Sequence, residues 1–321
     1  MDEVSKAELH CHLDGVPDPA LLRTLRDEGV ALPVTPEVFE AAYPVRDYAS
    51  FFGWFDALRP TAGRFDLYQH VARLHVERLK AQNVVYAELF VAALSLDTAE
   101  AIDQVAGLRT AVDAHEDGRI QVELLNAWRR NRDLESLDRI ATRNIQLFER
   151  GLICGVAVAG PEEGAPIAPL ARIMDRYDEA GVPIEIHAAE WVGPESAWDA
   201  LRHGHPRRLG HGTHVLEDPQ LVDVLRERQI HIEMCPTSNL LTGSIARIED
   251  HPIRRAFEAG LNVGVNTDDP GAFLCSMSSE HALLAERFGF TPAERLQLGR
   301  NAVRSRFRPD LRVDGARALA G

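Results

Sequence analysis

Histidine and carboxylate side chains gather in four short motifs that lie far apart in the sequence. The motifs are His10-Cys11-His12, His187-Ala188-Ala189-Glu190, Gly210-His211-Gly212 and Asp268-Asp269. Imidazole nitrogens and carboxylate oxygens are ligands that divalent metal ions take in proteins, and three imidazoles with one carboxylate suit zinc with an open position for water. Such an ion lowers the pKa of the water and makes it a nucleophile near neutral pH.

His10 and His12 would leave the same face of a β-strand, because side chains alternate between the two faces. Cys11 would point the other way, which argues against it as a ligand. Taken singly, each motif has an ordinary structural interpretation, such as a hydrogen-bonded histidine pair, a core histidine or a helix cap at Asp268. Their joint occurrence favours a metal site, so we expect His10, His12, His187 and Asp268 to bind one Zn²⁺ ion per chain.

Two further residues could move protons at this site. Glu190 lies three residues beyond His187, which carries it past the strand end and over the site as a candidate acid. Strand order places His211 where it could act as a base or orienting group. The alternative is that His211, which lies between two glycines, only packs in the core. Residues 153–160 contain no lysine and no acidic residue, so a single metal ion is expected and not a bridged pair.

Eight short apolar or β-branched runs alternate with amphipathic segments of helical periodicity. The runs are 7–12, 84–90, 120–125, 153–158, 183–187, 208–210, 230–234 and 262–265. This alternation predicts a parallel sheet, and eight units without a linker predict a closed (β/α)₈ TIM barrel with its site at the C-terminal strand ends. The alternative is an open doubly wound sheet, which usually has a glycine fingerprint after its first strand; here residues 10–15 read HCHLDG instead.

We expect residues 1–321 to form one domain, with extra helices inserted after the first strand at about 32–67. This segment contains much of the aromatic content of the chain, between residues 43 and 55. The aromatic side chains could pack on the barrel, or they could form part of a hydrophobic lid over its mouth.

The composition restricts the partners and the compartment. The chain is 45% hydrophobic and 26% charged, with a net charge of −14 spread along its length. Such a surface repels nucleic acid polymers and anionic membranes, so a small-molecule substrate is expected. The sequence has no signal-peptide pattern, no membrane-spanning run and no paired cysteine motif, which predicts a cytoplasmic, reduced protein whose oligomeric state stays open.

The motifs also resemble, in order and spacing, those of the adenosine deaminase family of metal-dependent hydrolases, over about residues 7–310. They are HCHLDG at 10–15, AGPE at 159–162, HAAE at 187–190, LGHGT at 209–213, MCPTSN at 234–239 and NTDDP at 266–270. The resemblance implies a barrel enzyme of purine metabolism that hydrolyses a 6-aminopurine nucleoside to the 6-oxo product and ammonia.

The resemblance also implies a role for each site residue. Zinc would be held by His10, His12, His187 and Asp268. Asp268 would also orient the attacking water, His211 would accept its proton or stabilise its charge, and Glu190 would protonate the ring nitrogen beside the attacked carbon. The substrate would be contacted by Asp14 on the ribose side and by Asp269 and the backbone amide of Gly160 at the two edges of the purine.

Two departures from the family pattern leave the substrate open. Ala189 replaces the usual glycine before the catalytic glutamate, where a methyl group would narrow the pocket or shift Glu190, and Phe90 stands where an arginine is common. The segment from Trp191 to Trp198 resembles deaminases of 6-aminodeoxyfutalosine, a modified adenosine, and free adenine is a third possible substrate. Two alternative functions from other classes of protein are also open: a non-catalytic barrel that binds a nucleoside, and a single-zinc hydrolase of cyclic amides.

Overall fold

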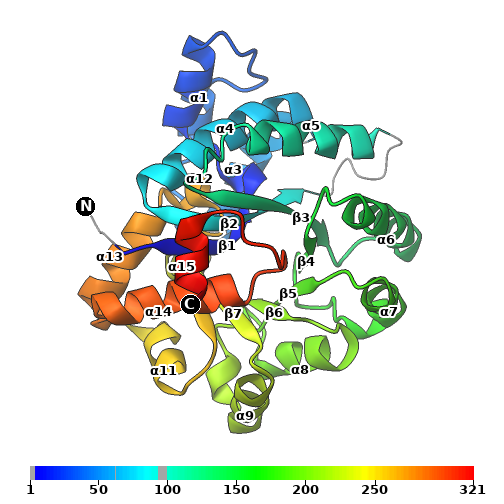
Figure 1. Ribbon diagram of the computed structural model, residues 1–321, viewed down its shortest axis with the longest axis vertical. Coiled ribbons are helices and arrows are strands. Elements are labelled where there is room, and N and C mark those ends of the chain that lie inside the picture. The colour runs from blue at the N-terminus through cyan, green and yellow to red at the C-terminus, as the bar shows by residue number, and fades with distance from the viewer. Residues whose placement is uncertain (1–3, 62, 93–99) are drawn as a thin grey trace.

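An eight-stranded parallel sheet forms the centre of the molecule in the computed structural model, which describes residues 4–61, 63–92 and 100–321 (Figure 1). The strands are β1 (Lys6–His12), β2 (Val84–Ala92), β3 (Gln121–Arg129), β4 (Gly155–Ala159), β5 (Ile184–Ala188), β6 (Arg208–His211), β7 (His231–Met234) and β8 (Val263–Val265). Neighbours pair in chain order, and a parallel bridge between Cys11 and Asp268 joins the two ends of the sheet. The (β/α)₈ barrel is therefore confirmed, and each predicted strand overlaps an observed one.

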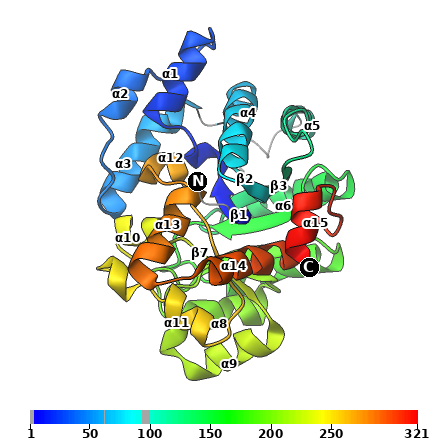
Figure 2. The same cartoon turned by 60° about the vertical axis from the view of Figure 1, so that its left-hand side comes forward.

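Helices surround the barrel wall (Figures 1 and 2). They are α4 (Phe65–Ala81), α5 (Ala101–Asp113), α6 (Leu134–Glu149), α7 (Ala171–Glu179), α8 (Pro194–His203), α9 (Pro219–Arg228), α11 (Ile253–Glu258) and α13 (Met277–Phe288). Each buries an apolar stripe: in α6, for example, Leu137, Ile140, Ala141 and Leu147 recur at helical spacing on the buried face. None of the helices in the described ranges is both long enough and apolar enough to cross a membrane.

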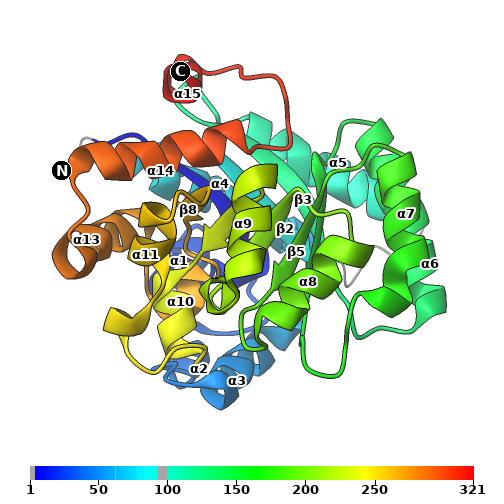
Figure 3. The ribbon, with the colours of Figure 1, turned by 90° about the horizontal axis from the view of Figure 1, so that it is seen from below.

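The two ends of the barrel are covered by different elements. In Figure 3, α2 (Pro36–Glu40) and α3 (Tyr48–Leu58) lie at one end, and α14 (Pro292–Arg304) and α15 (Asp314–Ala320) at the other. α14 contacts the backbone where strands begin, since Asn301 donates to the carbonyl of Val263 in β8. The helices at this N-terminal end close the barrel floor, so a site is expected at the opposite end, where the strands finish and where α2 and α3 lie.

The aromatic segment takes both of its expected roles. Trp54 is fully buried, and Phe51 stacks on Phe273 of α12 (Pro270–Phe273) with ring centroids 5.1 Å apart. Tyr48 and Phe52 line the cavity at the barrel mouth, as Phe51 also does. The helix α3 therefore packs on the core through some of its aromatic side chains and covers the barrel mouth with others. That residues 1–321 form one domain stays a prediction.

An ion network fills the barrel interior beneath the mouth. Arg208 reaches Glu88 at 2.6 Å and Glu233 at 2.5 Å, and all three side chains are fully buried. The guanidinium carbon of Arg208 also lies 3.5 Å from the ring centroid of Phe307. Because a charge removed from water is tolerated only when it is paired, these residues depend on one another.

We predict that Arg208→Met lowers the free energy of unfolding by about 3–5 kcal/mol, because two buried carboxylates lose their cation. Chemical denaturation measures the change. The control is Arg226→Met, which breaks an exposed pair with Asp223 and should cost less than about 1 kcal/mol. Equal effects of the two substitutions would contradict a structural role for the interior network.

Candidate active site and metal centre

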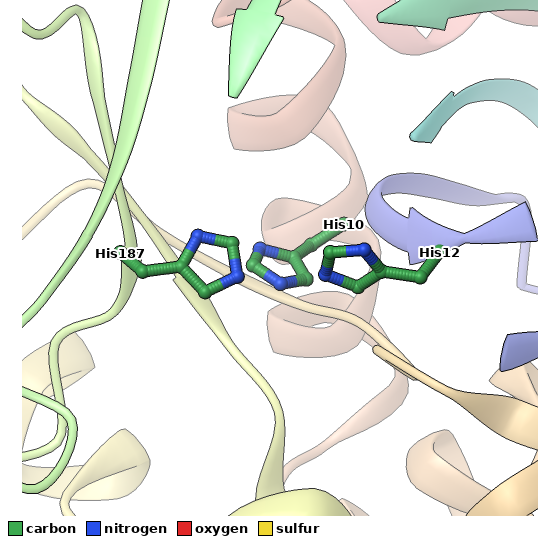
Figure 4. Close-up of side chains that lie close together, drawn as sticks. All are labelled: His10, His12 and His187. Carbon is green, nitrogen blue, oxygen red and sulfur yellow. The ribbon is translucent and has the colours of Figure 1, made fainter. Parts of the chain in front are cut away.

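Three histidine rings converge at the C-terminal ends of β1 and β5 (Figure 4). The ring centroid of His10 lies 5.4 Å from that of His12 and 4.5 Å from that of His187. The three residues can each offer a ring nitrogen within 4.8 Å of the others. The predicted orientation of β1 is confirmed, because Cys11 points away from this cluster and lies 3.5 Å from His75 in the outer core.

Asp268 completes the cluster from the end of β8. Its Oδ1 lies 3.5 Å from Nε2 of His10 and 3.4 Å from Nε2 of His12. These separations are close to the edge of a tetrahedron built with metal–ligand bonds of about 2.0–2.1 Å, which is about 3.3 Å. Nε2 of His10 is buried without a hydrogen-bond partner among the described residues. The donor set and its spacing therefore fit one divalent ion.

Carboxylates orient two of these imidazoles from behind. Nδ1 of His10 lies 2.9 Å from Glu233, and Nδ1 of His187 lies 3.1 Å from Glu185. A carboxylate can only accept here, so each ring holds its proton on Nδ1 and turns the lone pair of Nε2 to the centre, as metal-binding histidines usually do. Neither glutamate was predicted from the sequence, although Glu185 lies two residues before His187 and therefore on the same face of the strand.

Burial sets the protonation of the imidazoles. It lowers the pKa of His12 to about 3 and that of His187 well below its usual value, so both rings are neutral. For His10, burial also lowers the pKa, but the neighbouring carboxylates of Asp268 and Glu233 outweigh it and raise the pKa well above its usual value. The carboxylates around His10 thus attract a positive charge, which a metal ion can supply in place of a proton.

Glu190 lies beside this cluster and is only 2% exposed. Its Oε2 is 3.6 Å from Nε2 of His211. Burial, followed by the charges of Asp268 and Glu162, raises the pKa of Glu190 well above its usual value, which favours its protonated form. Its backbone N–H donates to Glu162 Oε1 at 2.8 Å, which fixes the turn that carries it.

Three residues at the strand ends have left-handed backbones. The φ angles are 53° for Ala189, 61° for His211 and 63° for Asp268. Such conformations cost non-glycine residues about 1–2 kcal/mol each and are often found at functional sites. This explains why glycine is usual at position 189. The methyl group of Ala189 packs in the core and does not line the cavity, so the substitution strains the backbone instead of narrowing the pocket.

Gly210 makes room for two of the histidines. A Cβ at this position would lie 2.9 Å from His10 Cε1, closer than a real Cβ approaches, and 3.1 Å from His187 Nδ1, which is tighter than most such contacts. The glycine before His211 therefore lets the imidazoles meet inside the narrow barrel.

A cavity of about 600 Å³ opens above the cluster. Besides His12, His187, Glu190, His211 and Asp268, it is lined by the three residues predicted to contact substrate, which are Asp14, Gly160 and Asp269. Burial raises the pKa of Asp14 to about 6 and that of Asp269 well above its usual value. One oxygen of each is buried without a hydrogen-bond partner in the described part of the chain, as is Trp191 Nε1 at the rim. These atoms are available to a ligand.

Comparison with known proteins decides the family. The adenosine deaminase family model matches residues 5–318. The chain belongs to the adenosine deaminase family. It is therefore a metal-dependent hydrolase that acts on the C–N bond of a cyclic amidine, in an adenine-like or adenosine-like substrate.

Relatives with several named activities resemble this adenosine deaminase family member. An adenine deaminase from Rhizobium leguminosarum bv. trifolii is 33% identical, with 95% of each chain covered. An aminodeoxyfutalosine deaminase from Streptomyces avermitilis is 32% identical, covering 94% of this chain and 86% of the relative. The solved structure of an adenine deaminase from Arthrobacter aurescens superimposes with a TM-score of 0.85 at 27% identity, covering 99% of both chains.

We predict that Glu185→Gln weakens metal binding by about 10–100-fold, because His187 loses the carboxylate that orients it. Competition between the metal-free protein and a chelating dye measures the affinity without any assay of activity. Glu123→Gln is the matched control, since Glu123 is also buried but pairs with Arg308 and Arg312 away from the histidines. An unchanged affinity in Glu185→Gln would contradict the assignment of His187 as a ligand.

Proposed function

We propose that this deaminase catalyses the zinc-dependent hydrolysis of a 6-aminopurine nucleoside to its 6-oxo product and ammonia. The observation that carries the proposal is the position of Glu190, a buried carboxyl group with a raised pKa, in the cavity that His12, His187, His211 and Asp268 also line. Hydrolytic deamination needs both a metal-activated water and an acid that protonates the ring, and this cavity contains groups for each.

Each proposed role follows from where the residue lies. His10, His12, His187 and Asp268 hold the ion, which when bound supplies a water activated for attack on the ring carbon. Glu190 protonates the neighbouring ring nitrogen, which makes that carbon more electrophilic. Asp268 orients the water, and its other oxygen accepts a hydrogen bond from Ser238 at 2.7 Å that fixes the carboxylate.

The substrate contacts are proposed from the lining of the cavity. Asp269 binds the imidazole edge of the purine, and the backbone N–H of Gly160 reaches the pyrimidine edge from the opposite side. Asp14 stands near the end of β1 with an unpartnered oxygen, where it can accept a hydrogen bond from a ribose hydroxyl. A cavity of about 600 Å³ has more space than a free base fills, which favours a nucleoside.

A modified adenosine is the second candidate substrate, and the rim of the cavity favours it. Tyr48, Phe52, Phe55 and Trp191 line the rim, and the rings of Tyr48 and Trp191 meet edge-to-face at 5.3 Å. Such a wall can stack on an apolar group attached to the ribose, as in 6-aminodeoxyfutalosine. Free adenine is the third candidate, because several relatives are named adenine deaminases.

We predict that Glu190→Gln keeps the metal and loses about 10²–10⁴-fold in turnover, because the amide cannot protonate the ring nitrogen. Metal analysis and ammonia release are measured on the same preparation. Near-native turnover of Glu190→Gln would show that another group is the acid.

We predict ammonia release from adenosine, and faster release if a nucleoside bears an apolar extension that reaches the aromatic rim. The panel is adenosine, deoxyadenosine, methylthioadenosine, 6-aminodeoxyfutalosine and adenine, followed by ultraviolet change and ammonia together. Turnover of adenine alone would refute the nucleoside assignment, and a ring-opened product without ammonia would indicate a cyclic-amide hydrolase.

A further inference from the structure

A buried chain of hydrogen bonds connects His211 to the start of α11. Asn239 Nδ2 lies 3.1 Å from Nδ1 of His211, and Asn239 Oδ1 lies 3.2 Å from Nε2 of His251. The chain ends at the backbone N–H of Ile253, which donates to Nδ1 of His251 at 3.2 Å. The three side chains are at most 2% exposed, so water does not compete for these contacts.

The direction of every hydrogen bond in this chain follows from the backbone N–H of Ile253, where the chain ends. The N–H of Ile253 can only donate, so Nδ1 of His251 carries a lone pair. Burial lowers the pKa of His251 to about 3, so the ring is neutral and its one proton is on Nε2. That N–H needs an acceptor, which must be the amide oxygen of Asn239. The amide nitrogen of Asn239 then donates to Nδ1 of His211, which is therefore also a lone pair.

His211 is consequently in the opposite tautomer to His10 and His187. His10 and His187 face carboxylates at Nδ1 and turn a lone pair to the centre of the cluster. His211 faces an amide donor at Nδ1, so the proton of its neutral ring is on Nε2, the nitrogen that lies 3.6 Å from Glu190. An N–H cannot bind a metal ion, although His211 lies in one cluster with His10 and Asp268.

We propose that Asn239 and His251 are positioning residues that fix His211 as a hydrogen-bond donor at Nε2. This proposal rests on the proposed function in one respect: the acceptor of this hydrogen bond is taken to be the attacking oxygen. In this tautomer His211 cannot take the proton of the water. The O–H bond of the water therefore breaks toward Asp268, and His211 stabilises the negative charge that develops on the oxygen. A preorganised donor aimed at such a charge typically contributes about 10²–10³-fold to turnover.

The direct test is the tautomer of His211 in the metal-loaded protein. Long-range proton–nitrogen correlation spectra of protein labelled with ¹⁵N in its histidine rings distinguish Nδ1–H from Nε2–H, and the His211 signals are those lost in His211→Gln. We expect the proton on Nε2. A proton on Nδ1 would overturn the proposal, and a failure to release ammonia from any purine would refute the proposed function while leaving this measurement intact.

Asn239→Asp reverses the polarity with almost no change of shape, because both side-chain oxygens can only accept. We expect the proton of His211 to move to Nδ1 and kcat to fall about 10²-fold, with little change in KM. If Asn239→Asp does not fold, His251→Phe gives the second test, because Asn239 then loses the donor that holds its amide in place. A variant that keeps Nε2–H, or that moves the proton and keeps kcat, would contradict the proposal.

A matched control lies at the other end of the barrel. His231 is also buried, and its Nδ1 lies 3.0 Å from Oδ1 of Asn262. Asn262→Asp therefore makes the same chemical change beside a buried histidine that is far from the cavity. We expect it to leave the His211 signals and kcat unchanged, and a loss of kcat equal to that of Asn239→Asp would mean that the effect is only structural.

Discussion

The structure depends on the burial of carboxylates around imidazoles at the mouth of a closed barrel. Glu185, Glu233 and Asp268 are removed from water and lie around the imidazoles of His10, His12 and His187. Burial raises the pKa of Glu185 to about 7 and raises that of Glu233, so a nearby positive charge is needed to keep both ionised, and Arg208 supplies one to Glu233. The cluster therefore favours a positive ion, and the orientation of the imidazoles follows from the same carboxylates.

The barrel supplies this cluster through its backbone as well as its side chains. Parallel strands finish at one rim, so residues separated by more than two hundred positions in the sequence meet there. Left-handed conformations at Ala189, His211 and Asp268 then turn the chain away from the strand direction just where chemistry is needed. The strain at these positions is held in place by the surrounding core, and at Ala189 the buried methyl group is part of that core.

Much of the site could be predicted from the sequence because its ligands are local features of strands. The eight apolar runs were enough to predict the barrel, and the spacing of His10 and His12 at the end of the first run indicated where its rim lies. The partners behind the ligands were not predictable in this way, because Glu233 approaches His10 across 223 positions and His251 acts through Asn239. The place of α14 was not predictable either, since helical periodicity alone does not indicate which helix closes the barrel floor.

The most direct test of the central claim is anomalous diffraction at the zinc absorption edge from crystals of the metal-loaded protein. We expect one ion within about 2.0–2.2 Å of a ring nitrogen of His10, His12 and His187 and of an oxygen of Asp268, with His211 outside the coordination sphere. An ion bound elsewhere, or one coordinated by His211 in place of these ligands, would contradict it.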